Sequence, residues 1–100
     1  MAVGMLLAGE GFTRDAYVQL TEKMFGNYPM RPDQAPEGVL LHTAGQSAMG
    51  WYVCDVWESK EHFQRFAEQQ IGPAMHELTG GQADGPQPQF FEIETLVSTT

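Results

Sequence analysis

Three predicted strands carry apolar side chains on both faces, and this pattern constrains the fold more than any other feature. Successive side chains of a strand point to opposite faces of its sheet. The runs 3–8, 39–44 and 51–57 are largely apolar at odd and even positions alike. A sheet with one face in water instead alternates between apolar and polar residues. Both faces of this sheet therefore need a cover.

Two helices are predicted from their capping residues and from apolar residues at helical spacing. Thr13 offers a hydroxyl N-cap to the first helix, which ends at Gly26. Ser59 caps the second helix, and we expect Gly72-Pro73 to break it. Residues 74–78 add at most one further turn.

The remaining segments complete a βαββαβ order. Residues 26–37 hold three prolines and indicate a long loop, and residues 45–50 connect the second and third strands as a hairpin. A second loop, at 80–88, leads to a last strand at 90–97. The sequence therefore predicts a single α+β domain over residues 1–100, with a four-stranded antiparallel sheet and two helices on one face.

A second copy of the chain is the most economical cover for the other face of the sheet. Two helices can cover only one face of four strands, and the chain holds no further element for the opposite face. A copy of the same chain presents the same apolar face, so two sheets can pack together. We therefore expect a homodimer.

Charge and cysteine usage exclude several classes of partner and compartment. Thirteen acidic residues against five basic ones give a formal net charge of −8, which would repel nucleic acid and anionic membranes. The single cysteine, Cys54, rules out an intrachain disulfide framework. The opening apolar run lacks the basic start of a secretion signal, and no run reaches the ~20 apolar residues of a membrane span. We expect a soluble, cytoplasmic protein.

His42 and Asp55 are the candidate catalytic residues. His42 lies centrally in an apolar strand, and a histidine there is either a general base or a core histidine with one hydrogen bond. Asp55 lies in the middle of the next strand, where a buried carboxylate needs a partner. Either it orients a catalytic group or it makes a structural bond to a backbone amide or an arginine.

Aromatic residues are the candidate substrate-binding residues. They are Trp51, Trp57, Phe63 and Phe66, which would form either the walls of a pocket for a flat ligand or simply the core. Tyr28 and Arg31 lie in the proline-rich loop, which is either a lid over that pocket or a plain connection. The three histidines have no metal-ligand spacing, so we predict no metal site.

Much of the chain resembles a known family. The run 38–45, the run 50–59 that contains Asp-Val-Trp-Glu-Ser, the pair Phe63 and Phe66, and the run 90–93 are similar to the antibiotic-biosynthesis-monooxygenase-like proteins of the dimeric α/β-barrel superfamily. The resemblance implies a ferredoxin-like fold, a homodimer, and a pocket between sheet and helices in each subunit.

The resemblance also implies a chemistry. The best-known family members oxidise polycyclic aromatic phenols with molecular oxygen and use neither metal nor flavin. Trp57 and His42 match a tryptophan and a histidine of their pockets, whereas Val53 and Phe63 stand where an asparagine and a tyrosine are expected.

Three functional hypotheses follow. The first is a cofactor-independent, monooxygenase-like enzyme that acts on a small hydrophobic, aromatic or polyketide-type molecule, with His42 moving protons and Asp55 orienting it. The second is a binding or assembly module without chemistry, which the two apolar replacements favour. The third is a cofactor-free cyclase, isomerase or lyase in the same pocket.

Overall fold

The fold was analysed in a computed structural model, which describes residues 2–9, 11–80 and 87–97. The strands and helices follow one another as β1 (Val3–Ala8), α1 (Arg14–Phe25), the 3-10 turn η1 (Pro32–Gln34), β2 (Val39–Ser47), β3 (Gly50–Trp57), α2 (Lys60–Phe66), the π-helical turn η2 (Ala67–Ile71), α3 (Gly72–Thr79) and β4 (Gln89–Glu92).

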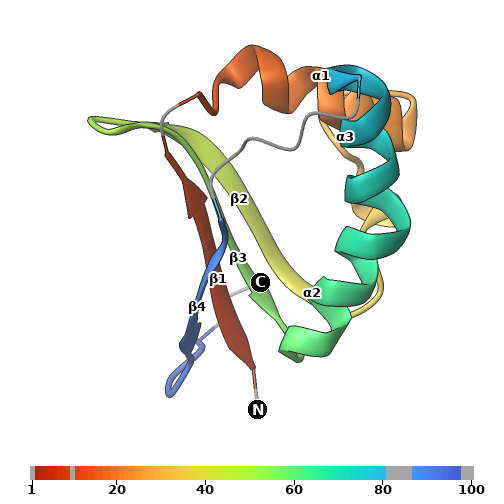
Figure 1. Cartoon of the computed structure of the whole chain (residues 1–100). Coiled ribbons are helices and arrows are strands. Elements are labelled where there is room, and N and C mark those ends of the chain that lie inside the picture. Colours follow the sequence, from red (N-terminus) through yellow and green to blue (C-terminus); the bar gives the residue numbers. More distant parts are fainter. Residues whose placement is uncertain (1, 10, 81–86, 98–100) are drawn as a thin grey trace.

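The four strands form one antiparallel sheet in the order β2-β3-β1-β4. The helices lie along one face of this sheet, as Figure 1 shows. The predicted α+β class, the βαββαβ order and the ferredoxin-like arrangement are therefore confirmed. The core between the layers is built around Met5, Val53, Trp57 and Phe63.

The start of each main helix is the one predicted. The Thr13 hydroxyl accepts a hydrogen bond from the amide of Ala16 at 3.1 Å. The Ser59 hydroxyl accepts one from the amide of His62 at 3.2 Å. Gly26 ends α1 in the left-handed conformation, at φ 81°, which glycine adopts without steric cost.

The second helical segment does not break at Gly72-Pro73, contrary to the prediction. The turn η2 leads directly into α3, and proline stands in the first turn of that helix. Proline cannot donate an amide hydrogen bond to the preceding turn, but that turn is the wider π-helical one, in which Gly72 donates to the carbonyl of Ala67, so the helix continues past the ring. The segment 60–79 therefore lies as one long cover along the sheet.

Two strand boundaries also differ from the prediction. The β2–β3 hairpin is tighter than expected, because β2 continues to Ser47 and β3 begins at Gly50. The last strand ends at Glu92 rather than at residue 97. The predicted loop at 80–88 lies mostly outside the described residues, which omit 81–86.

A bulge in β2 decides which of its side chains face the helices. Val39 pairs with Trp57, but Leu41 pairs with Val56, so that Leu40 is an extra residue in the strand. Strict alternation would place Val39 and His42 on opposite faces. With the bulge both line the same cavity under the helices.

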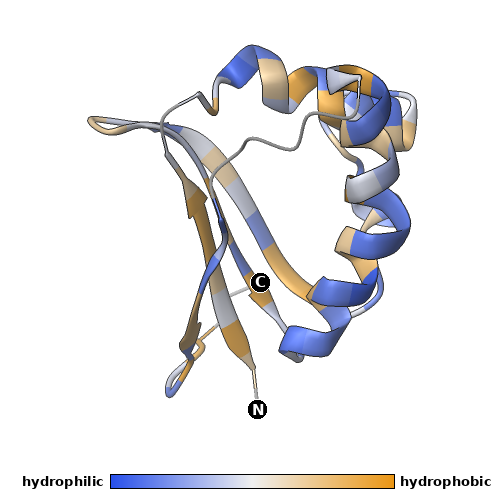
Figure 2. Cartoon of the chain, viewed as in Figure 1, coloured by the Kyte–Doolittle hydropathy of each residue, from blue (hydrophilic) through white to orange (hydrophobic). Residues whose placement is uncertain are grey.

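The opposite face of the sheet is largely apolar, and some of its side chains are exposed. Leu41 and Phe91 there are 50% and 44% exposed. Figure 2 shows that hydrophobic colour extends along the strands, whereas much of the helical layer is hydrophilic. No helix in the described part of the chain is both long and apolar enough to cross a membrane.

Candidate functional site

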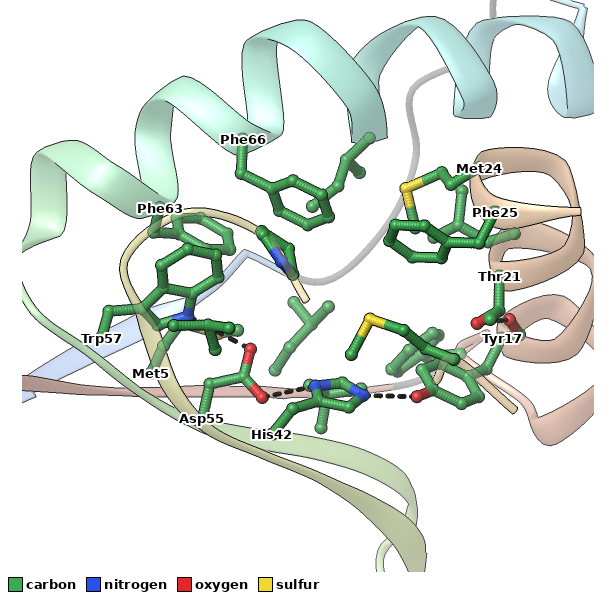
Figure 3. A pocket seen from close by; sticks show the side chains of 18 residues that line it. Met5, Tyr17, Thr21, Met24, Phe25, His42, Asp55, Trp57, Phe63 and Phe66 are labelled. Carbon is green, nitrogen blue, oxygen red and sulfur yellow. Dashed lines mark hydrogen bonds and ion pairs between the residues drawn. The ribbon is translucent and has the colours of Figure 1, made fainter. Parts of the chain in front are cut away.

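A cavity of about 90 Å³ lies between the sheet and the helices. Its walls are mostly apolar side chains from β1, α1, β3 and the segment 60–71, as the close view in Figure 3 shows. Most of its lining residues are apolar, and they include Met5, Leu20, Met24, Phe25, Val53 and Ile71. Polar side chains enter this cavity only in one group, described next, and at Thr21.

His42 and Asp55 stand opposite each other on β2 and β3. The Nδ1 atom of His42 lies 2.7 Å from Oδ1 of Asp55. The indole N–H of Trp57 donates to the other carboxylate oxygen at 3.2 Å. Asp55 is 5% exposed, and these two partners account for both of its oxygens. The carboxylate of Asp55 thus pairs with two side chains and, among the described residues, with no arginine.

Tyr17 joins this pair from the helical side. Its phenol oxygen lies 2.5 Å from Nε2 of His42. A carboxylate only accepts hydrogen bonds, so Nδ1 of His42 carries a proton toward Asp55. In the neutral imidazole Nε2 then accepts from the Tyr17 hydroxyl. Figure 3 shows the resulting chain from Tyr17 through His42 to Asp55.

Burial is the main influence on the ionisation of Tyr17. Removing the phenol from water raises the pKa of Tyr17, and the nearby Tyr28 and Asp55 act in the same direction, whereas the Thr21 side chain opposes them. Tyr17 therefore remains protonated at neutral pH and serves as a hydrogen-bond donor toward His42.

The arrangement can serve as a proton relay in an apolar cavity. The Tyr17 hydroxyl donates to His42, and the carboxylate of Asp55 would stabilise the positive charge that His42 acquires on taking a proton. The apolar walls lower the local dielectric constant, which strengthens these interactions.

The structure brings together most of the predicted site residues. His42, Asp55, Trp57, Phe63 and Phe66 all line the cavity. The ring of Trp57 packs against both phenylalanines, with its centroid 5.5 Å from that of Phe63 and 5.7 Å from that of Phe66.

Three predicted substrate-binding residues do not line this cavity. Trp51 and Tyr28 pack against the outer side of Tyr17, with ring centroids 5.6 and 5.9 Å from it. Arg31 is exposed and pairs with Asp33 in η1. The loop that contains Arg31 is tied to the end of α1 by the Gln34 side chain, which donates to the carbonyl of Phe25.

Sequence reasoning missed Tyr17 as a site residue. In the sequence Tyr17 counted only toward the helical spacing of the first helix. The feature that could have identified it is the phenol hydroxyl, because Tyr17 is a polar-tipped residue on the side of the helix that packs against the strand of His42. That signal becomes readable only when the helix is placed on the sheet, because the two residues are 25 positions apart.

Comparison with solved structures identifies the fold. The protein Rv0793 from Mycobacterium tuberculosis is similar over 97% of this chain and 97% of its own, at a TM-score of 0.59 and 14% identity. A candidate antibiotic biosynthesis monooxygenase from Chloroflexus aurantiacus is similar over 100% of both chains, at a TM-score of 0.61 and 14% identity. The chain shares the fold of these two proteins.

A third structure with the same fold is that of a candidate antibiotic biosynthesis monooxygenase from Deinococcus radiodurans. It is similar over 99% of this chain and 96% of its own, at a TM-score of 0.51 and 12% identity. No family model and no curated protein matches the sequence. The similarity thus concerns the fold alone.

Proposed function

We propose that this protein is a cofactor-independent, monooxygenase-like enzyme that acts on a small hydrophobic, aromatic or polyketide-type molecule. The observation that carries the proposal is the Tyr17–His42–Asp55 chain in the wall of an apolar cavity. The meeting of three polar side chains from three elements in such surroundings supports a functional site. Solved structures of the same fold that are described as candidate monooxygenases support this choice.

The first step is removal of a proton from the substrate. A phenol, or an acidic C–H beside an aromatic carbonyl, gives its proton to the Tyr17 oxygen while the Tyr17 proton moves to Nε2 of His42. The net result is a substrate anion and an imidazolium whose charge Asp55 balances. Trp57 keeps Asp55 in place through its indole N–H.

Molecular oxygen is the oxidant of the second step. The substrate carbanion forms a C–O bond to O₂ and becomes a peroxide anion, which takes the proton back from His42. The hydroperoxide then loses water and leaves a carbonyl group. In total one CH₂ group and one O₂ give one C=O and one H₂O, so atoms and electrons balance.

The open face of the sheet is proposed to pack against a second copy of the chain. Leu41 and Phe91 are large apolar side chains that stay about half exposed on that face. A homodimer would bury them and place one cavity on each outer side of the paired sheets. Together with the single cysteine and the negative charge, this describes a cytoplasmic dimer with no nucleic-acid or membrane partner.

A ligand-binding module without chemistry is the second candidate. Val53 and Phe63 line the cavity with apolar surface where the family resemblance implies polar groups. A third candidate needs no oxygen. If the hydrogen-bonded series of Tyr17, His42 and Asp55 only moves a proton, the same cavity would support a cofactor-free cyclase, isomerase or lyase.

Turnover with and without oxygen tests the proposal. Purified protein is incubated with anthrones and naphthols in air and under argon, and products are followed by chromatography. We expect a quinone-type product in air alone, and His42→Ala should lower its rate by about 10²–10⁴-fold. His76→Ala is the matched control, because His76 is exposed on α3 and lies outside the cavity.

The outcomes separate the three hypotheses. A product that forms equally under argon indicates an isomerase, cyclase or lyase. Ligand-induced thermal stabilisation with no product indicates a binding module. A rate that His42→Ala leaves unchanged contradicts the proposed proton transfer.

A further inference from the structure

A second chamber lies directly beside the inner cavity. It is open to solvent, has a volume of about 250 Å³ and is lined by residues of η1, the segment that follows it, and the segment 62–70. Three residues, Phe25, Pro36 and Phe66, line both chambers. The two spaces therefore adjoin at these three residues.

Two aromatic rings form much of this partition. The rings of Phe25 and Phe66 are nearly parallel, at 10°, with centroids 6.4 Å apart. Both side chains are only partly buried, and they come from different elements, α1 and α2. Ring rotations at such positions need no movement of the backbone.

The inner cavity alone is small for the proposed substrates. Small-molecule sites usually enclose ~300–1,000 Å³, and about 90 Å³ is well below that range. The inner and outer chambers together reach its lower end. A ligand that parts Phe25 from Phe66 would therefore find a site of ordinary size.

The outer chamber differs from the inner one in polarity. Its lining includes Arg65, His62 and Glu37, with the amides of Gln69 and Gln70. His62 is held by the hydroxyl of Ser59. The guanidinium of Arg65 makes no ion pair within the residues that the structure describes. An exposed arginine beside neutral amides provides a fork for a planar carboxylate.

We propose that the two chambers form one elongated site for an amphipathic monocarboxylate. Its aromatic end occupies the inner cavity beside Tyr17 and His42, and its carboxylate lies in the outer chamber against Arg65. Glu37 borders the same chamber and disfavours a second negative charge. The inference rests on the proposed function insofar as the inner cavity is taken as the substrate site.

A single-tryptophan protein provides the test. The chain has two tryptophans, and only Trp57 lines the inner cavity. The indole N–H of Trp51 has no partner among the described residues, so Trp51→Phe removes no hydrogen bond. In that background Trp57 fluorescence reports on the inner cavity. The probes are 4-phenylbutanoate and its neutral amide, 4-phenylbutanamide, which have the same ring and chain length.

Arg65→Gln should remove the preference for the acid. We expect the acid to bind about tenfold more tightly than the amide, as one charge-assisted contact provides, and the ratio to fall to about one in Arg65→Gln. Arg14→Gln is the matched control, because Arg14 stacks on Tyr28 away from both chambers, and it should keep the ratio. Equal affinities for acid and amide, or an unchanged ratio in Arg65→Gln, would overturn the proposal.

The partition is tested separately by the rate of binding. Phe25→Leu keeps an apolar side chain but removes the stacked ring, and it leaves the Phe25 carbonyl free to accept from Gln34 as before. Stopped-flow mixing with 4-phenylbutanoate should show binding several-fold faster than in the parent protein. An unchanged binding rate would contradict a partition that has to open for the ligand.

The two proposals can fail independently. If acid and amide change Trp57 fluorescence with equal affinity, the inner ligand site stands and the outer carboxylate site is wrong. If neither probe affects Trp57, the elongated site is wrong, while the His42→Ala turnover assay still decides the chemistry.

Discussion

At the residue scale, the buried carboxylate of Asp55 organises the site. Its two oxygens are taken by His42 and by the indole of Trp57. The sequence indicated that a carboxylate in the middle of this strand needs a partner, and His42 was singled out separately. That the two residues bind each other follows from the register of β2 on β3, which no local pattern encodes.

Tyr17 should make the protein sensitive to alkaline pH. Because burial raises the pKa of Tyr17 above its ordinary value of 10.0, the folded state holds this proton at a pH where the unfolded chain releases it. The stabilisation is complete below about pH 10 and is lost as the pH rises toward the folded-state pKa.

Urea unfolding between pH 8 and 11 measures this effect. The free energy of unfolding should fall more steeply above pH 10 in the parent protein than in Tyr17→Phe, which cannot ionise. Tyr52→Phe is the control, since Tyr52 lies on the opposite face of the sheet. Parallel pH profiles for the parent and Tyr17→Phe would contradict the assignment.

At the element scale, capping signals and loop chemistry explain most of the boundaries. The two hydroxyl caps and the left-handed Gly26 are read from neighbouring residues, because each bond spans three or four positions. The prediction that the helix breaks at Gly72-Pro73 was wrong, because it rested on those two residues alone. A π-helical turn carries the helix past the proline, and no local sequence pattern predicted that turn.

Ser59→Ala should destabilise the start of α2. The Ser59 hydroxyl accepts from the amide of His62 and also contacts its Nδ1 atom at 2.7 Å. Loss of such a cap costs about 1 kcal/mol of the free energy of unfolding. Thermal or urea unfolding measures the change, and Ser59→Asn should keep most of the stability because asparagine also caps helices. Equal losses in both variants would show that the hydroxyl does not act as a cap.

At the scale of the whole molecule, the sheet has one covered and one open apolar face. The helices bury Met5, Val53 and Trp57 on the inner face. On the outer face the ring of Phe91 lies over Gly4, where any side chain would collide with it. Phe91 itself remains 44% exposed, so this apolar face suits a second apolar sheet.

Leu41→Asp should convert the proposed dimer to a monomer. A carboxylate at this position would be buried without a partner when two outer faces pack together. Size-exclusion chromatography with light scattering measures the mass at micromolar concentration. Met49→Asp is the control, because Met49 is also exposed and apolar but lies in the tip of the β2–β3 hairpin. A monomeric parent protein, or a Leu41→Asp variant that remains dimeric, would contradict the proposal.

Salt provides an independent check on the same interface. Each copy carries a formal net charge of −8, so two copies repel each other at low ionic strength. The dimer should therefore become tighter as salt is raised, since an apolar contact is kept while the repulsion is screened.

The sequence by itself determined the order of strands and helices, the helix caps, and the presence of apolar side chains on both sheet faces. These properties depend on residues within a few positions of one another, where dihedral preferences and short hydrogen bonds dominate. The tertiary structure alone decided that a bulge at Leu40 brings Val39 and His42 to one face, and that Tyr17 meets His42. Those contacts join distant segments, and their geometry is fixed by how the sheet and helices pack as a whole.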